Sequence, residues 1–190
     1  MDRTGTILGE EMEKPIQNIL LVVDVQKGFC QSEATKQLPK KISELIDTQL
    51  FDTVIATKFF NFNNSMFEKA MGWTAFKTEE EQELLVDCDF VVKKSGYGCV
   101  NSQFAHFLRS LEPFRIFLVG CDTDCCVLTI ATELFENGIR PIVLSSYCAS
   151  NGGKVSHLSG LTCLKRLIGE KQISDVEFTN DSKLEQLENL

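Results

Sequence analysis

The stretch ILLVVDVQKGF, residues 19–29, opens the part of the chain that decides its fold. Its first five residues are a continuous apolar run, which suits a central strand buried on both faces of a parallel sheet. Further runs of this kind recur at 53–57, 90–92, 116–119, 141–144 and, more weakly, 172–178. Between them lie segments with helical spacing or helix-start signals, at 38–50, 65–86, 101–111, 124–137 and 154–168. Strands that alternate with helices predict an α/β fold with a mostly parallel six-stranded sheet covered on both faces.

The length and the ends of the chain predict one domain. A chain of 190 residues fits a single core, and no internal repeat, low-complexity segment or linker interrupts it. Residues 1–14 and the polar tail from about residue 179 resemble frayed ends. We therefore expect the domain to span 1–190, with its core at about 15–178.

The composition limits the classes of partner and the compartment. The net charge of -8 argues against a nucleic-acid partner, because phosphates attract Lys and Arg. No apolar run approaches the roughly 20 residues that span a bilayer, so no membrane partner is expected. The eight cysteines include several in apolar or helical stretches, without paired CxxC motifs, and the N-terminus has no apolar signal segment. These features predict a reduced, cytoplasmic protein rather than a disulfide scaffold.

Three chemically reactive residue types lie just past predicted strand ends. Asp24 ends the first apolar run, Lys93 and Lys94 end the third, and VGCDTDCCV (119–127) follows the fourth and opens a helix. In open parallel sheets, ligands bind beyond the carboxyl ends of the strands, where the strand order reverses. With the strand order 3-2-1-4-5-6, Asp24 and the 121–126 turn would face each other, with the lysine nearby.

This convergence predicts a nucleophilic cysteine. Cys126 would lie in the first turn of a helix, where the helix dipole and Lys94 are expected to lower its pKa and make it the most reactive thiol. Asp24 could accept the thiol proton while Lys94 orients Asp24, and the amides of the turn could stabilise an oxyanion. Taken singly, each residue has a simpler explanation. An Asp often caps a turn, a Lys is usually a solvated charge, and a buried Cys often only packs.

Four segments, in the correct order between residues 19 and 168, resemble isochorismatase-like hydrolases. The first strand carries an Asp-x-Gln-x-x-Phe pattern at Asp24, Gln26 and Phe29. The segment KSGYGCV (94–100) resembles the family's catalytic-lysine segment, and GCDTDCCVLTIATELFENGI (120–139) resembles its nucleophile turn and helix. The segment SYCASNGGKVSHLSGL (146–161) resembles a later family motif, although Ser146 stands where an Asp is usual.

The resemblance implies a three-layer α/β/α fold with strand order 3-2-1-4-5-6 and a catalytic triad of Asp24, Lys94 and Cys126. It implies hydrolysis through an acyl-thioester on the cysteine. It also implies a cis peptide bond between Cys121 and Asp122, which would direct the backbone amides of Asp122 and Cys126 at the oxyanion. Family members are commonly homo-oligomers, so a homodimer or homotetramer is expected.

One departure from the family's nicotinamidases concerns the metal. Their Asp-x-His metal motif follows the second strand, and here Phe59 and Asn61 stand at the ligand positions in ATKFFNFNNS (56–65). Phenylalanine cannot bind a metal ion, so we expect neither a metal site nor another cofactor. Since the cysteine is present, the expected reaction is hydrolysis of an amide-type C–N bond in a small-molecule substrate.

The substrate pocket and two other functions remain open from sequence. We expect the pocket to be lined by Phe29, Phe60, Trp73 and Tyr97, although aromatic side chains are equally common in cores and interfaces. One alternative is a non-catalytic binding protein of the same family. The other is a thiol redox sensor at Cys125 and Cys126, which is disfavoured because vicinal cysteines rarely form a good disulfide.

Overall fold

Six parallel strands form one sheet in the order β3-β2-β1-β4-β5-β6, which confirms the predicted strand order. The computed structural model describes residues 15–112 and 114–190. The strands are β1 (Gln17–Val23), β2 (Thr53–Phe59), β3 (Phe90–Lys94), β4 (Phe114–Cys121), β5 (Pro141–Ala149) and β6 (Ile173–Ser174). The reversal of strand order falls between β1 and β4, where a ligand site is expected in an open parallel sheet.

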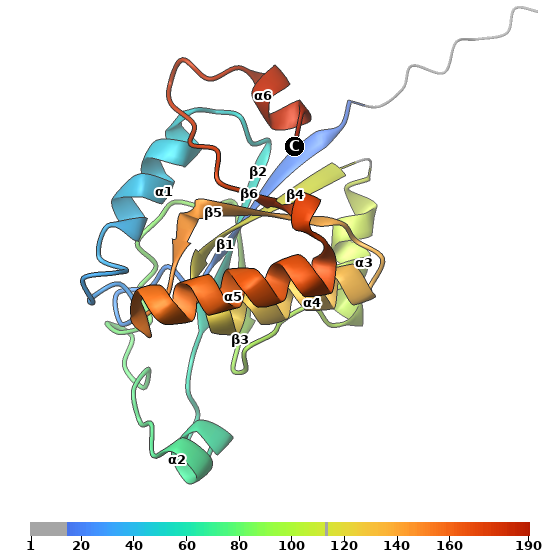
Figure 1. The fold of residues 1–190 in the computed structure, drawn as a ribbon. Helices are drawn as coiled ribbons and strands as arrows, with labels where there is room; N and C mark the ends of the chain where they lie inside the picture. The colour runs from blue at the N-terminus through green and yellow to red at the C-terminus, as the bar shows by residue number, and fades with distance from the viewer. Residues whose placement is uncertain (1–14, 113) are drawn as a thin grey trace, which may run out of the picture.

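Helices cover both faces of the sheet, so the fold has three layers (Figure 1). The helices are α1 (Leu38–Asp47), α2 (Met66–Met71), α3 (Ser102–Ser110), α4 (Leu128–Glu136), α5 (Gly153–Ile168) and α6 (Leu184–Glu188). Helices α3, α4 and α5 pack on one face, whereas α1 and α6 pack on the other. Helix α2 lies apart from the layers, on an arm that extends beyond the sheet (Figure 1).

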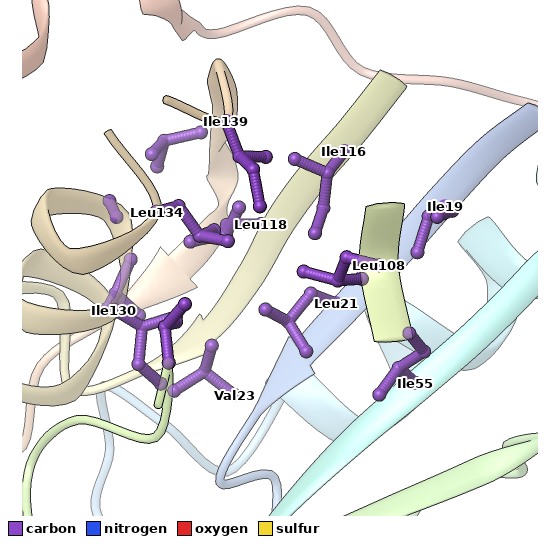
Figure 2. Close-up of a cluster of buried hydrophobic side chains, with 14 of the residues drawn as sticks. Ile19, Leu21, Val23, Ile55, Leu108, Ile116, Leu118, Ile130, Leu134 and Ile139 are labelled. Carbon is purple, nitrogen blue, oxygen red and sulfur yellow. The ribbon is translucent and has the colours of Figure 1, made fainter. Parts of the chain in front are cut away.

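The apolar run of β1 supplies both layers of the core. Ile19, Leu21 and Val23 point toward α3 and α4 (Figure 2), whereas Leu20 and Val22 point toward α1. All five side chains are fully buried. Successive side chains of a strand alternate between faces, so burial on both faces accounts for the unbroken run.

The glycine before the 121–126 turn allows β1 and β4 to approach closely at the switch point. Gly120 has a φ of +118°, and a β-carbon there would lie 2.1 Å from the Val23 carbonyl oxygen. Any other residue would force the two central strands apart, next to Asp24 and the cysteine turn.

The helix predicted over 65–86 is mostly wrong. Only α2 (Met66–Met71) forms, because Gly72 adopts a left-handed conformation with φ +66° and ends the helix. The following segment is irregular, and an isolated bridge between Gln26 and Leu84 ties it to the end of β1. The predicted sixth strand is also shorter, at Ile173–Ser174.

The C-terminal tail is ordered, contrary to the expectation of a frayed end. Residues Leu184–Glu188 form α6, and Leu187 is fully buried against Phe178 in the core layer of α1. Leu187, together with Leu190 packed against the same layer, therefore docks a mainly polar segment. The expectation for residues 1–14 lies outside the described residues. In the part of the chain that the structure describes, no helix is long and apolar enough to cross a membrane.

Candidate active site

Asp24 lies directly after β1 and is fully buried. Its φ of +51° is in the left-handed region, which is uncommon for residues other than glycine and is often found at functional sites. Thr57 on the neighbouring strand β2 holds it in place. The Thr57 hydroxyl donates to Asp24 Oδ1 at 2.6 Å and accepts the Asp24 amide at 3.0 Å. One carboxylate oxygen is therefore engaged by the scaffold, and Oδ2 faces the other reactive groups.

Lys94, the last residue of β3, reaches across the ends of the central strands. Its Nζ lies 2.7 Å from Asp24 Oδ2 and donates to Cys126 Sγ at 3.3 Å. It also donates to the carbonyl oxygens of Gly96 and Tyr97 at 2.9 and 3.2 Å. The lysine is 5% exposed, so its ammonium position is fixed by these four contacts and not by solvent.

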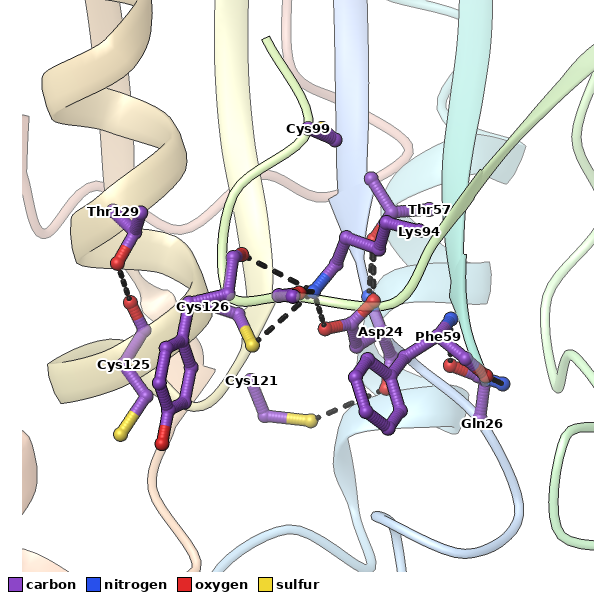
Figure 3. A network of polar contacts seen from close by, with 12 residues as sticks. Asp24, Gln26, Thr57, Phe59, Lys94, Cys99, Cys121, Cys125, Cys126 and Thr129 are labelled. Carbon is purple, nitrogen blue, oxygen red and sulfur yellow. Dashed lines mark hydrogen bonds and ion pairs between the residues drawn. The ribbon is translucent and has the colours of Figure 1, made fainter. Parts of the chain in front are cut away.

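Cys126 lies in a π-helical turn, Thr123–Val127, between β4 and α4. The peptide bond between Cys121 and Asp122 is cis. The Asp122 carbonyl oxygen accepts the amides of both Cys125 and Val127 at 3.1 Å, which closes the turn on either side of Cys126. Figure 3 shows the Cys126 sulfur pointing toward Lys94, beside Asp24. The structure thus brings the three predicted residues together at the switch point of the sheet.

The electrostatics of the thiol differ from the sequence-based expectation. Burial and the Asp24 carboxylate raise the pKa of Cys126 well above its usual value, while Lys94 acts in the opposite direction. The expected lowering of this pKa was therefore wrong, because the sequence does not show how deeply the sulfur is buried. Burial opposes the ammonium charge of Lys94, but Asp24 and Cys126 outweigh it and raise the lysine pKa. These directions favour the protonated thiol and the charged form of the lysine.

This electrostatic state predicts the pH dependence of thiol labelling. We expect the alkylation rate of Cys126 by iodoacetamide to rise about ten-fold per pH unit up to pH 9 without a plateau, because the thiolate is the reactive form. The exposed Cys163, rather than Cys126, should be labelled first at neutral pH. Peptide mass spectrometry of time courses at several pH values measures both rates. A plateau for Cys126 near neutral pH would instead indicate a stable thiolate–lysine pair.

A cavity of about 450 Å³ opens over the thiol. Phe29, Trp73 and Tyr97 line it, as predicted. Its other lining residues are mostly apolar; they are Gly28, Phe59, Phe67, Met71, Ala75, Phe76, Asp122, Cys125, Cys126 and Asn151. The aromatic side chains also pack on one another, as in the stacked pair Phe29 and Trp73 with ring centroids 6.3 Å apart. Such a wall favours a flat or apolar substrate group.

The comparisons with known proteins assign the family. The model of the isochorismatase domain matches residues 18–167. The chain belongs to the isochorismatase-like hydrolase family. A comparison with curated proteins returned no match.

Solved structures with this isochorismatase-like fold are similar over most of their length. A cysteine hydrolase from Pseudomonas syringae pv. phaseolicola is 18% identical, with a TM-score of 0.71, and the match covers 94% of this chain and 99% of that chain. N-carbamoylsarcosine amidase from Thermoplasma acidophilum is 17% identical, with a TM-score of 0.71 and coverages of 88% and 99%. The pyrazinamidase of Pyrococcus horikoshii in complex with zinc is 19% identical, with a TM-score of 0.70 and coverages of 85% and 99%.

The positions at and just after the end of β2 where nicotinamidases of this family are expected to bind a metal ion hold Phe59 and Asn61 in this chain. Phe59 has no donor atom, and its ring faces the Lys94 ammonium at 5.3 Å from the centroid. The Asn61 amide donates to the carbonyl oxygens of Trp73 and Ala75, and its oxygen accepts the Ser65 hydroxyl at 2.6 Å. Phe59 thus packs beside Lys94, and Asn61 holds the 61–76 segment through its hydrogen bonds. The residues present at these positions do not fit a metal ion.

One predicted pocket residue of this family member is wrong. Phe60 lines a separate charged groove with Lys58 and Lys93, on the other side of β2 from the thiol. Side chains alternate along a strand, so Thr57 and Phe59 share the face of the site, whereas Lys58 and Phe60 point away. The strand extends to Phe59, two residues further than predicted, and Phe59 rather than its neighbour Phe60 lines the cavity.

The roles of several cavity and support residues were not predicted from sequence. Thr57 is the clearest, since a polar residue at the buried end of an apolar strand is a signal that the alternation pattern could have revealed. Gln26 is fully buried and pairs with the backbone of Phe59, donating to its carbonyl at 3.0 Å and accepting its amide at 2.8 Å. Phe67, Phe76 and the other lining residues of the arm had no such signal, because long-range contacts place them.

Proposed function

We propose that this isochorismatase-like chain hydrolyses an amide-type C–N bond of a small molecule through an acyl-thioester on Cys126. The observation that carries the proposal is the position of Lys94 Nζ, 2.7 Å from Asp24 Oδ2 and 3.3 Å from the sulfur of Cys126, a residue that lines an apolar cavity. A carboxylate, an ammonium and a thiol in mutual contact supply a base, a positioned charge and a nucleophile. A non-catalytic binding protein would not need this buried arrangement.

The first half-reaction forms the acyl-enzyme. Asp24 accepts the thiol proton as the Cys126 sulfur attacks the carbonyl carbon, because the raised pKa of the thiol calls for a base at the moment of attack. The C–S bond forms and the carbonyl oxygen becomes an oxyanion, which the amides of Asp122 and Cys126 stabilise. Asp24 then gives the proton to the nitrogen, the C–N bond breaks, and the amine leaves.

The second half-reaction consumes one water molecule. The water attacks the thioester carbon and transfers a proton to Asp24, the C–S bond breaks, and the proton returns to the sulfur. Lys94 remains charged throughout, consistent with its raised pKa, and keeps Asp24 oriented between two proton transfers. Acid and amine are the products, and the enzyme returns to its starting state.

The redox-sensor alternative receives less support from the site. Figure 3 shows the sulfurs of Cys125 and Cys126 pointing to different sides of the turn. Burial, together with the nearby Asp124 and Asp122 carboxylates, raises the pKa of Cys125 to about 11. A vicinal pair with divergent sulfurs and protonated thiols is poorly arranged for disulfide formation.

We expect hydrolysis to survive chelation. The proposed mechanism polarises the carbonyl with backbone amides, and the residues after β2 do not fit a metal, so EDTA should change kcat/KM by less than about two-fold. The measurement is amine release from simple aryl and alkyl amides before and after dialysis against EDTA, with the Cys126→Ala variant as background. Loss of activity that zinc or iron restores would refute the metal-independent mechanism.

A further inference from the structure

The Asp122 side chain has no role in the proposed mechanism, which uses only its backbone amide. Asp122 is the only charged residue that lines the cavity in the described part of the chain, and no Lys, Arg or His accompanies it there. A carboxylate in an apolar wall is costly unless something binds it. Its presence beside the nucleophile therefore requires an explanation.

Only one oxygen of this carboxylate is occupied. Asp122 Oδ1 accepts both the backbone amide and the side-chain amide of Asn151, each at 2.8 Å. Asn151 is held in turn by Thr35, which is fully buried and donates to Asn151 Oδ1 at 3.2 Å. Among the hydrogen bonds of the described residues, none involves Asp122 Oδ2. The carboxylate is thus fixed through Oδ1, with a second acceptor oxygen left for a ligand.

The positions of the other groups indicate which part of a substrate meets Asp122. A carbonyl carbon attacked by Cys126 has three substituents to place: the oxygen, the acyl body and the amine. The oxygen faces backbone amides, and the acyl body fits the aromatic wall around Phe29 and Trp73. The remaining polar side of the cavity is formed by Asp122 and Asn151, and a carboxylate accepts hydrogen bonds from N–H groups.

We propose, on the basis of the proposed amide hydrolysis, that the Asp122 carboxylate accepts an N–H of the scissile amide and selects uncharged primary or secondary amides over esters. The same carboxylate, without any lining cation, disfavours substrates that carry a carboxylate of their own. Asp122 is therefore a specificity-determining residue, and Asn151 and Thr35 position it.

Binding without turnover tests this selection directly. Trp73 is the only tryptophan of the chain and lines the cavity, so its fluorescence reports ligand binding there. In the Cys126→Ala background, benzamide and methyl benzoate share the acyl group and differ in the presence of N–H donors. We expect Asp122→Asn to weaken benzamide binding about ten-fold, because a hydrogen bond to a charged acceptor is lost. Methyl benzoate binding should change less than about two-fold, because that ligand makes no such bond.

A second variant in the same turn serves as the matched control for Asp122→Asn. Asp124→Asn removes a charge from the same turn, but Asp124 does not line the cavity, so it should leave both ligands unaffected. Equal weakening of both ligands by Asp122→Asn would show that Asp122 only shapes the turn. No selective effect, or no fluorescence response to either ligand, would also overturn the inference. Because these proteins cannot turn over substrate, failure of the hydrolysis mechanism would appear separately, as absent product from the unsubstituted enzyme.

Discussion

The Cys126→Ala variant is expected to lose amide hydrolysis by about four orders of magnitude or more in kcat, while remaining folded. The thiol is 7% exposed and contributes one sulfur to the core, so its removal leaves a small cavity and no unpaired charge. Asp24 and Lys94 remain paired with each other at 2.7 Å. The loss should therefore be chemical rather than structural, because Cys126 is the thiol that Lys94 contacts and that forms the acyl-enzyme in the proposed mechanism.

The adjacent cysteine provides the matched control. Cys125 also lines the cavity, but Lys94 donates to the sulfur of Cys126, so Cys125→Ala should change kcat by less than about ten-fold. Amine release measures kcat, and circular dichroism verifies folding. Near-normal turnover by folded Cys126→Ala, or abolished turnover by Cys125→Ala alone, would show that Cys126 is not the nucleophile.

Asp24→Asn and Lys94→Met should each abolish most of the activity, and their effects should be strongly non-additive. In the proposed mechanism, Lys94 orients Asp24, and this is how Lys94 contributes to catalysis. Each residue therefore depends on the other, and the double variant should be little slower than the worse single variant. The pair is also buried, and removal of one partner leaves an uncompensated charge that costs about 3–5 kcal/mol of stability. The double variant should recover part of that stability.

Kinetics and urea unfolding of all four proteins form a complete double-mutant cycle. Recovery of stability without recovery of activity is the expected signature of a buried catalytic pair. Additive losses in kcat would separate the two charges into independent roles and would leave only Cys126 in the mechanism. Additive losses in stability would show that the ion pair does not couple Asp24 to Lys94.

The strands and the edge of the sheet that holds the site could be predicted from periodic patterns in the sequence, whereas the strand order was implied by the family resemblance. Apolar runs marked the strands, and the carboxyl ends of parallel strands share one edge, which brought Asp24, Lys94 and Cys126 together. The resemblance to family motifs then selected Lys94 over Lys93 and Cys126 over Cys125. The homo-oligomeric state and cytoplasmic location remain predictions.

The parts that could not be predicted depend on long-range contacts and burial. The segment after Gly72 is held by Asn61, whose amide bonds to the carbonyl oxygens of Trp73 and Ala75, and not by a local pattern. The direction of the Cys126 pKa depends on the depth of the sulfur and its contact with Asp24. The misplacement of Phe60 came from choosing between adjacent aromatic residues: β2 extends to Phe59, whose side chain faces the cavity, and the next side chain points to the opposite face.

The central claim is that Cys126 carries the acyl group during turnover, and intact-protein mass spectrometry of the acid-quenched reaction tests it most directly. With an amide substrate in excess, we expect a species heavier by the acyl group, with the modification mapped to Cys126 and absent from Cys126→Ala. The adduct should disappear when substrate is exhausted, because water cleaves the thioester. An enzyme that releases amine rapidly with no adduct on any cysteine, and whose Cys126→Ala variant does the same, would contradict the account.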